Sequence, residues 1–204
     1  MIAWRAPSQR IRRSPPTGFI VPCNPALVSR PPADTDWLHE VKHDGYRVLA
    51  RKQGERVTLW TRRGTDYADR MPRIAEAVRG LSTEALIDGE AVVLRPDGRS
   101  DFEALLTKRG SEQAAYVAFD LLRLDGQDVR PDRIEDRREA LLRLIARVDG
   151  IPFSEAIEAD GRLVFAKACE MGLEGIVSKR AGSRYVSGNS RIWLKAKNPN
   201  FARM

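Results

Sequence analysis

The residues best suited to chemistry lie at positions 42–47, with the sequence KHDGYR. Apolar and polar residues alternate after the hexad and a short apolar run leads into it, which predicts a strand on each side. Asp44 and Gly45 predict a tight turn between these strands, because glycine tolerates positive φ and aspartate can bond its own backbone. Lys42, at a strand end beside a turn, is placed like a nucleophile. The alternative is a solvated lysine in a surface β-turn.

A lysine amine attacks only when it is neutral. The ordinary pKa of about 10.4 leaves roughly one amine in a few thousand neutral at pH 7. Burial or neighbouring cations raise that fraction, and lowering the pKa by about three units costs roughly 4 kcal/mol. Trp193, Lys195 and Lys197 share one face of a predicted strand, because residues two apart project together. Two lysines converging on Lys42 would be held there most naturally by a phosphate between them.

The composition is that of a globular chain of one domain, or one domain with an appendage. It has 204 residues, of which 42% are apolar and 31% are charged. The sequence lacks both a membrane-spanning apolar stretch and a signal peptide, so we expect a cytoplasmic protein without membrane contact. Cys23 and Cys169 are expected to be a loop thiol and a helix-packing residue. With only two histidines, a zinc site is excluded, and any metal should be a hard cation held by carboxylates and phosphates.

The net charge of +7 is concentrated near the N-terminus. Residues 1–33 carry five arginines, no acidic residue and seven of the twelve prolines, which predicts extended and largely irregular chain. We therefore expect a basic, proline-rich arm over residues 1–33 and a folded domain over residues 34–204. The arm suits contacts with a phosphate backbone, and a solubilising tail is the alternative.

Strand-like and helix-like segments alternate from residue 37 onward. Strands are predicted before and after residues 42–47 and at 56–61, 86–94 (interrupted at Asp88-Gly89), 116–122, 175–179 and 191–197, and helices at 72–81, 133–148 and 163–171. Ser100 and Glu103 predict a capping box before a further helix. Strands mixed with helices and joined by hairpin-type turns favour an α+β fold with mostly antiparallel sheets. No glycine-rich dinucleotide or P-loop signature is present.

Each chemical motif has a plain structural explanation when it is taken alone, since Asp-Gly-Glu is often a hairpin and Trp-Leu-Lys-Ala-Lys often an edge strand. Together and in this order they resemble the covalent nucleotidyltransferases, most closely ATP-dependent DNA ligases, and among those the ligase module of bacterial end-joining ligases. The resemblance covers about residues 19–197. It rests on KHDGYR at 42–47, TRRG at 61–64, DGE at 88–90, FD at 119–120, EG at 174–175 and WLKAK at 193–197.

The resemblance implies a nucleotidyltransferase (ATP-grasp-like) core of mostly antiparallel sheets flanked by helices, and a first reaction step. Lys42 would attack the α-phosphorus of ATP, expel pyrophosphate and become a lysyl-adenylate. Lys195 and Lys197 would neutralise the α-phosphate as charge builds on it. Glu174 would help to hold Mg²⁺ or Mn²⁺, which compensates the phosphates.

The remaining implied roles concern the nucleoside and the DNA. Phe119 would stack on adenine, with Trp193 also among the nucleotide-binding residues, and Glu40 would sit by the exocyclic amine. The further implied contacts are Glu90 with the ribose, Arg47 with the nucleotide or the nick phosphate, and Arg62 with the 5′-phosphate of nicked DNA, where a guanidinium fork fits well.

Only seven residues follow Lys197, too few for the oligonucleotide-binding (OB) domain that follows in these ligases. We therefore expect an adenylation core without an OB domain, either a fragment or a minimal protein, that contributes to nick sealing in DNA repair at the nucleoid. The expected partners are nicked double-stranded DNA and an end-binding protein or repair polymerase. One alternative is a nick- or end-binding module that has lost turnover. Another is an RNA ligase or a capping guanylyltransferase.

Overall fold

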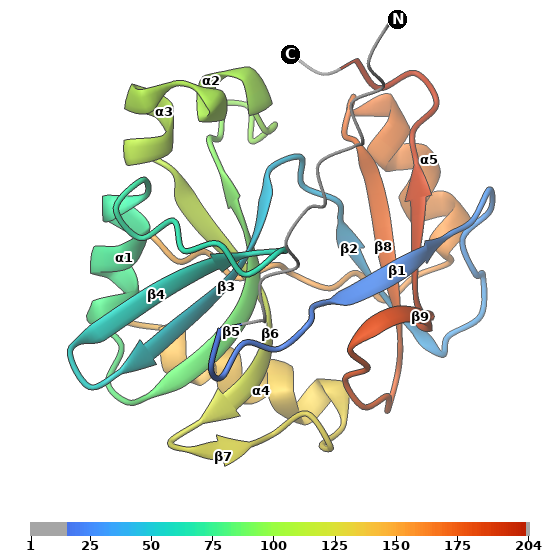
Figure 1. Ribbon diagram of the computed structural model, residues 1–204. Helices are drawn as coiled ribbons and strands as arrows, with labels where there is room; N and C mark the ends of the chain where they lie inside the picture. The colour runs from blue at the N-terminus through green and yellow to red at the C-terminus, as the bar shows by residue number, and fades with distance from the viewer. Residues whose placement is uncertain (1–15, 203–204) are drawn as a thin grey trace, which may run out of the picture.

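Two β-sheets meet along the middle of the molecule in the computed structural model, which describes residues 16–202 (Figure 1). The smaller sheet has the order β1-β9-β8-β2, with β1 at Cys23–Leu27, β2 at Trp37–Val41, β8 at Gly175–Arg180 and β9 at Gly188–Lys197. The larger sheet has the order β4-β3-β5-β6-β7, with β3 at Tyr46–Gln53, β4 at Arg56–Thr61, β5 at Ala85–Val92, β6 at Ala115–Leu124 and β7 at Gln127–Asp128. In this part of the chain, every neighbouring pair of these strands is antiparallel except the parallel pair β1–β9.

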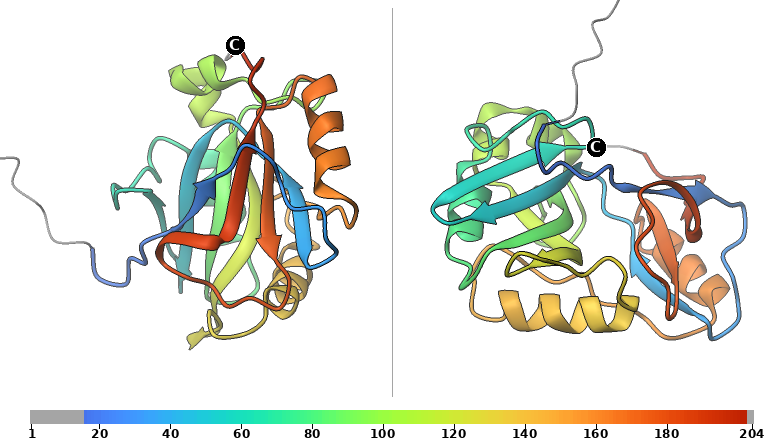
Figure 2. Two further views of the ribbon diagram at one scale, coloured as in Figure 1. Left: turned by 90° about the vertical axis from the view of Figure 1, so that its right-hand side faces the viewer. Right: turned by 60° about the horizontal axis from the view of Figure 1, so that its bottom comes forward.

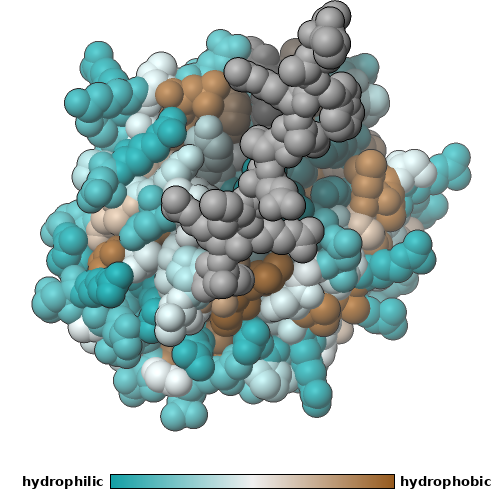
Figure 3. All heavy atoms as spheres, viewed as in Figure 1, coloured by the Kyte–Doolittle hydropathy of each residue, from teal (hydrophilic) through white to brown (hydrophobic). Residues whose placement is uncertain are grey.

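The helices cover the outer faces of the two sheets. Helices α1 (Pro72–Arg79) and α4 (Ile134–Ile145) pack on the five-stranded sheet, and α5 (Gly161–Glu170) packs against β8 and β2. Figure 2 shows α4 beneath the larger sheet and α5 at the side of the smaller one. The short helices α2 (Phe102–Leu106) and α3 (Lys108–Glu112) follow β5 at the top of Figure 1. Hydrophilic residues dominate the outer parts of the face drawn in Figure 3.

Alternation along the strands divides the hydrophobic core into layers. On β3, Val48 and Ala50 face α1 and α4, whereas Leu49 between them faces the smaller sheet. Leu49 packs there in a cluster that includes Trp60 and Trp193, so this layer joins the two sheets. A third cluster, which includes Ala168 and Ile176, lies under α5. The period of two read from the sequence is therefore the period that separates these layers.

The predicted α+β fold with antiparallel sheets is confirmed, but the turn at Asp44-Gly45 is not a hairpin. β2 and β3 belong to different sheets, and residues 42–45 cross from one sheet to the other. Gly45 does not have the positive φ that the turn would need. Glycine is required at this position because a Cβ atom would lie 2.2 Å from the carbonyl oxygen of Ala91. Lys42 therefore lies at the junction of the sheets.

Several local expectations are also corrected. Cys23–Leu27 forms β1 within the expected irregular arm, and Cys23 is a buried strand residue rather than a loop thiol. Strand β5 runs through Asp88-Gly89 without a break. Helix α2 is capped by the side chain of Asp101, which accepts from Ala104 N–H, and not by Ser100. Residues 1–15 of the basic arm, which carry four of its five arginines, lie outside the described residues.

Within residues 16–202, no helix has the length and apolar character needed to cross a bilayer.

Candidate active site

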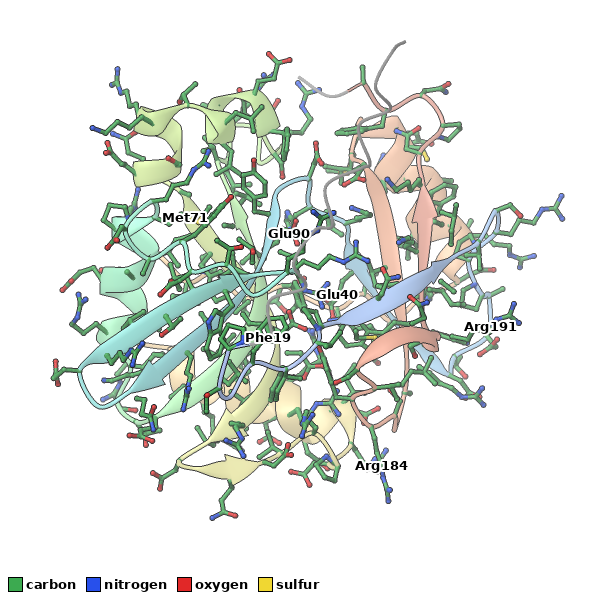
Figure 4. All side chains as sticks on the ribbon, viewed as in Figure 1. Phe19, Glu40, Met71, Glu90, Arg184 and Arg191 are labelled. Carbon is green, nitrogen blue, oxygen red and sulfur yellow. The ribbon has the colours of Figure 1, made fainter. Side chains whose placement is uncertain are left out.

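A cavity of about 170 Å³ opens where the two sheets meet. Its walls come from both sheets, and Figure 4 shows Glu40 and Glu90 in this central region, with Arg184 and Arg191 at the periphery. The lining residues are Pro22, Cys23, Asn24, Pro25, Glu40, Val41, Lys42, His43, Arg47, Arg62, Glu90, Phe119, Val177, Lys179, Trp193 and Lys195. They place basic residues, carboxylates and aromatic rings around one space, although they come from distant parts of the sequence.

Lys42 is held at the cavity by a carboxylate from the start of β8. Its Nζ lies 2.5 Å from Oε2 of Glu174, and its backbone N–H donates to Gly175 O at 2.9 Å. The other oxygen of Glu174, Oε1, lies 3.2 Å from Nζ of Lys197. Lys195 lines the cavity next to them, and its pKa is lowered by burial and then by the positive charges of Lys42 and Lys197. The three lysines therefore converge, with the carboxylate of Glu174 between two of them.

Glu90 lines the cavity from β5, next to a rigid ionic chain. Burial raises the pKa of Glu90 to about 7, although Arg47 and Lys42 oppose the rise. Arg47 forms a two-point ion pair with the fully buried Asp88, at 2.5 Å and 2.7 Å. Tyr185 donates to the same carboxylate at 2.6 Å and accepts from the backbone N–H of Cys23 at 2.8 Å. These contacts attach β1 to Arg47 and Asp88 of the larger sheet.

Phe119 lines the cavity from β6, on the face opposite to Ala118, and β6 bulges at this residue. Ala118 pairs with Gly89 and Asp120 pairs with Asp88, so Phe119 has no partner on β5. An extra residue of this kind turns the side chains beside it, and such bulges are common next to active sites. The ring of Phe119 lies 6.3 Å from that of Trp193 on β9, nearly perpendicular to it, and the Arg47 guanidinium lies 4.5 Å from the Phe119 ring centre.

Glu40 is buried at the same aromatic end of the cavity. Its Oε1 lies 2.5 Å from Nη1 of Arg138 on α4 and 2.7 Å from Nζ of Lys179 on β8. Its Oε2 accepts from the hydroxyl of Ser154 at 2.8 Å. Burial lowers the pKa of Lys179, and the carboxylate of Glu40 opposes that shift. These three partners hold the buried carboxylate in one orientation.

Most residues proposed from the sequence lie together around the cavity. Lys42, Glu40, Arg47, Glu90, Phe119, Trp193, Lys195 and Arg62 line it. Glu174 and Lys197 lie just behind Lys42, and the Lys197 side chain is 52% exposed. Residues 22–25, Val177 and Lys179 also line the cavity, although no role was predicted for them from the sequence. The sequence did hold a signal that Lys179 is buried, because this lysine lies in an apolar strand on the same side as Val177.

The donor groups at the site suit a metal ion only if phosphates share in binding it. Within residues 16–202, no three histidine, cysteine, aspartate or glutamate side chains converge to hold an ion by themselves. Glu174 and Glu90 supply carboxylates, and both oxygens of Glu174 already face lysines. Magnesium commonly binds through one or two carboxylates together with substrate phosphates. The residues present fit that arrangement.

Comparison with known proteins agrees with this geometry. The profile of the ATP dependent DNA ligase domain matches residues 28–197. The multifunctional non-homologous end joining protein LigD of Pseudomonas aeruginosa is 39% identical over 191 residues, which cover 91% of this chain and 23% of that protein. The chain therefore spans about a quarter of the length of this relative.

Two solved structures share the fold. The ligase domain of Mycobacterium tuberculosis LigD matches with a TM-score of 0.75 and 31% identity, over 87% of this chain and 60% of that one. A mycobacterial DNA ligase D complexed with ATP and MES matches with a TM-score of 0.74 and 32% identity, over the same shares of the two chains. The chain belongs to the ATP-dependent DNA ligase domain family, as an adenylation domain similar to the ligase modules of end-joining proteins.

Proposed function

We propose that this chain is a ligase adenylation core that transfers AMP from ATP to Lys42 and so contributes to nick sealing in DNA repair. The observation that carries the proposal is the placement of Lys42 at the junction of the sheets, beside a cavity that Lys195 also lines. The mycobacterial ligase D that was solved with ATP supports ATP as the nucleotide.

The reaction follows from the charges around Lys42. Its neutral amine attacks the α-phosphorus, the phosphorus–nitrogen bond forms, and the bond to the bridging oxygen breaks as pyrophosphate leaves. The ammonium must first lose a proton, and Glu174 at 2.5 Å is the nearest carboxylate in position to receive it. Lys195 and Lys197 then stabilise the negative charge that develops on the α-phosphate.

The other walls bind the rest of the nucleotide. Phe119 and Trp193 bind the adenine ring, and Glu40 faces its exocyclic amine. Glu90 contacts the ribose, and Arg47 contacts the nucleotide or the nick phosphate. Glu174, with the phosphates of ATP, would hold Mg²⁺ or Mn²⁺, which neutralises phosphate charge when it is bound.

The DNA-directed part of the proposal concerns Arg62 and the partners. Arg62 is exposed at the rim of the cavity, where its guanidinium can meet the 5′-phosphate of nicked double-stranded DNA. The Pseudomonas relative is named as an end-joining protein. We therefore propose an end-binding protein or a repair polymerase as a partner, and a location in the cytoplasm at the nucleoid.

Intact-mass measurement after incubation with ATP and Mg²⁺ or Mn²⁺ tests the proposal. The chain should gain the mass of one AMP, and Lys42→Ala should remove the gain completely because no other amine occupies its position. Lys167→Ala changes an exposed lysine on α5, paired with Glu170, and should keep the full gain. A wild-type chain that stays unmodified with both metals, or an equal gain in Lys42→Ala, would overturn it.

A further inference from the structure

The carboxylate of Glu40 has one hydrogen-bonding position left for a ligand. A carboxylate offers about four acceptor positions. Arg138 and Lys179 use two on Oε1, and Ser154 uses one on Oε2. Among the described contacts, one position on Oε2 is left. Glu40 has only 2% of its surface exposed, yet it lines the cavity, so a molecule in the cavity is the natural partner for that position.

Lys179 connects this carboxylate to the aromatic wall. Its Nζ donates to the carbonyl oxygen of Phe119 at 3.1 Å and lies 4.5 Å and 4.3 Å from the ring centres of Phe119 and Trp193. The side chain extends from β8, is 1% exposed and also lines the cavity. It therefore contacts β2, β6 and β9 at once. Removing its charge would loosen Glu40 and both rings together.

The two ends of the cavity differ in chemistry. Lys42 and Lys195 attract the phosphates, so the base of a bound nucleotide lies at the end formed by Phe119, Trp193 and Glu40. Adenine carries an amine at position 6, which donates to a carboxylate. Guanine and hypoxanthine carry a carbonyl oxygen there, which a carboxylate repels.

We propose that Lys179 is a positioning residue that sets selectivity for adenine by fixing Glu40 as an anionic acceptor against position 6 of the base. Glu40 touches the base, and Lys179 acts through it. Arg138 and Ser154 also hold the carboxylate, but Lys179 alone among these three contacts both aromatic rings of the wall. The inference rests on the proposed adenylation and adds the group that enforces the choice of nucleotide.

The test compares ATP with inosine triphosphate, in which the amine at position 6 is replaced by a carbonyl oxygen. The kcat/KM of lysyl-nucleotide formation is measured with each. Lys179→Met keeps the chain length without the charge. This variant should raise KM for ATP about tenfold with a smaller change in kcat. It should lower the ATP-to-inosine triphosphate ratio, which is kcat/KM for ATP divided by kcat/KM for inosine triphosphate, about tenfold or more. Lys179→Arg restores the charge and should recover most of that ratio.

Arg137→Met is the matched control. Arg137 is a buried cation of α4, paired with Asp120 at 2.8 Å, so its loss lowers stability in the same way. Arg137 does not line the cavity, so the ATP-to-inosine triphosphate ratio of Arg137→Met should stay at the wild-type value. An unchanged ratio in Lys179→Met, or an equal fall in Arg137→Met, overturns the inference.

Glu40→Gln keeps the test decisive if Lys179→Met fails to fold. An amide can offer either an N–H or an oxygen at the same place, so this variant should also lose discrimination between the two nucleotides. A wild-type ratio in Glu40→Gln overturns the inference. The proposed function fails separately, if the wild-type chain forms no adenylate with ATP.

Discussion

Glu90 and Lys195 face the same cavity, and burial favours the neutral form of each side chain. The pKa of Glu90 rises to about 7, and the pKa of Lys195 falls. The nearby charges act differently on them, because Lys42 favours the ionised form of Glu90 but disfavours the ionised form of Lys195. An empty cavity therefore contains groups whose charge is partly suppressed, and a bound polyanion would restore the charge of the lysine.

The pKa of Glu90 predicts a pH-dependent stability. The folded chain binds the proton of the Glu90 carboxyl group more tightly than the unfolded chain does. The stabilisation that results is therefore fully present below about pH 4.5. It is lost as the pH rises to about 7, and the loss is about 3 kcal/mol at most. Glu90→Gln removes this dependence. The free energy of unfolding of Glu90→Gln minus that of the wild type should therefore increase by about 3 kcal/mol at most between pH 4.5 and pH 7.5.

Urea titrations at the two pH values measure that difference. Glu103→Gln changes an exposed acid of α2 and should show no comparable shift. If Glu90→Gln differs from wild type by the same free energy at both pH values, the raised pKa of Glu90 is wrong.

β1 shows how an element at a sheet edge completes the cavity. It pairs with β9 in parallel, with a register shift between Pro25 and Ala26, and residues 22–25 line the cavity. The seven prolines of residues 1–33, of which Pro25 lies in β1, predicted irregular chain here. Proline is tolerated at a sheet edge and at a register shift, and β1 has both features. Strands β3 and β4 were predicted from their alternation, and β6 was predicted from a continuous apolar run, which the structure buries on both faces.

Tyr185→Phe tests the attachment of β1. The change removes the hydroxyl that accepts from Cys23 N–H and donates to Asp88, which leaves a buried N–H without that partner. We expect a loss of about 1–3 kcal/mol in the free energy of unfolding, measured by urea titration. Tyr67→Phe removes the same atom from a half-buried tyrosine elsewhere and should cost clearly less. Equal losses in the two variants would contradict a special role for the Tyr185 hydroxyl.

The charge of the whole molecule suits an acidic polymer. The chain carries a net charge of +7, of which residues 1–33 contribute five positive charges without an acidic residue. Arg62 adds a cation at the rim of the cavity. Contacts between basic side chains and DNA phosphates release counterions, so binding should weaken as the salt concentration rises.

Arg62→Ala should reduce the salt dependence of binding to a nicked duplex. One lost phosphate contact lowers the magnitude of the slope of log K against log salt concentration by about 1. Fluorescence anisotropy with labelled nicked DNA at several salt concentrations measures this slope. Arg143→Ala removes the same charge from an exposed position on α4 and should change the slope much less. Equal slopes for Arg62→Ala and wild type would place Arg62 away from the DNA.

Local patterns in the sequence were enough to predict most side chains that line the cavity and most of the strands and helices. Lys42, Lys195 and Phe119 were identified because residue type and spacing are local properties, and a strand records its buried face in a period of two. The tertiary structure was needed to show that residues 42–45 join two sheets, that Phe119 and Trp193 meet across the cavity, and that Lys179 holds Glu40. These features depend on pairing between strands far apart in the chain, and a local pattern shows that a face is buried without showing what it is buried against.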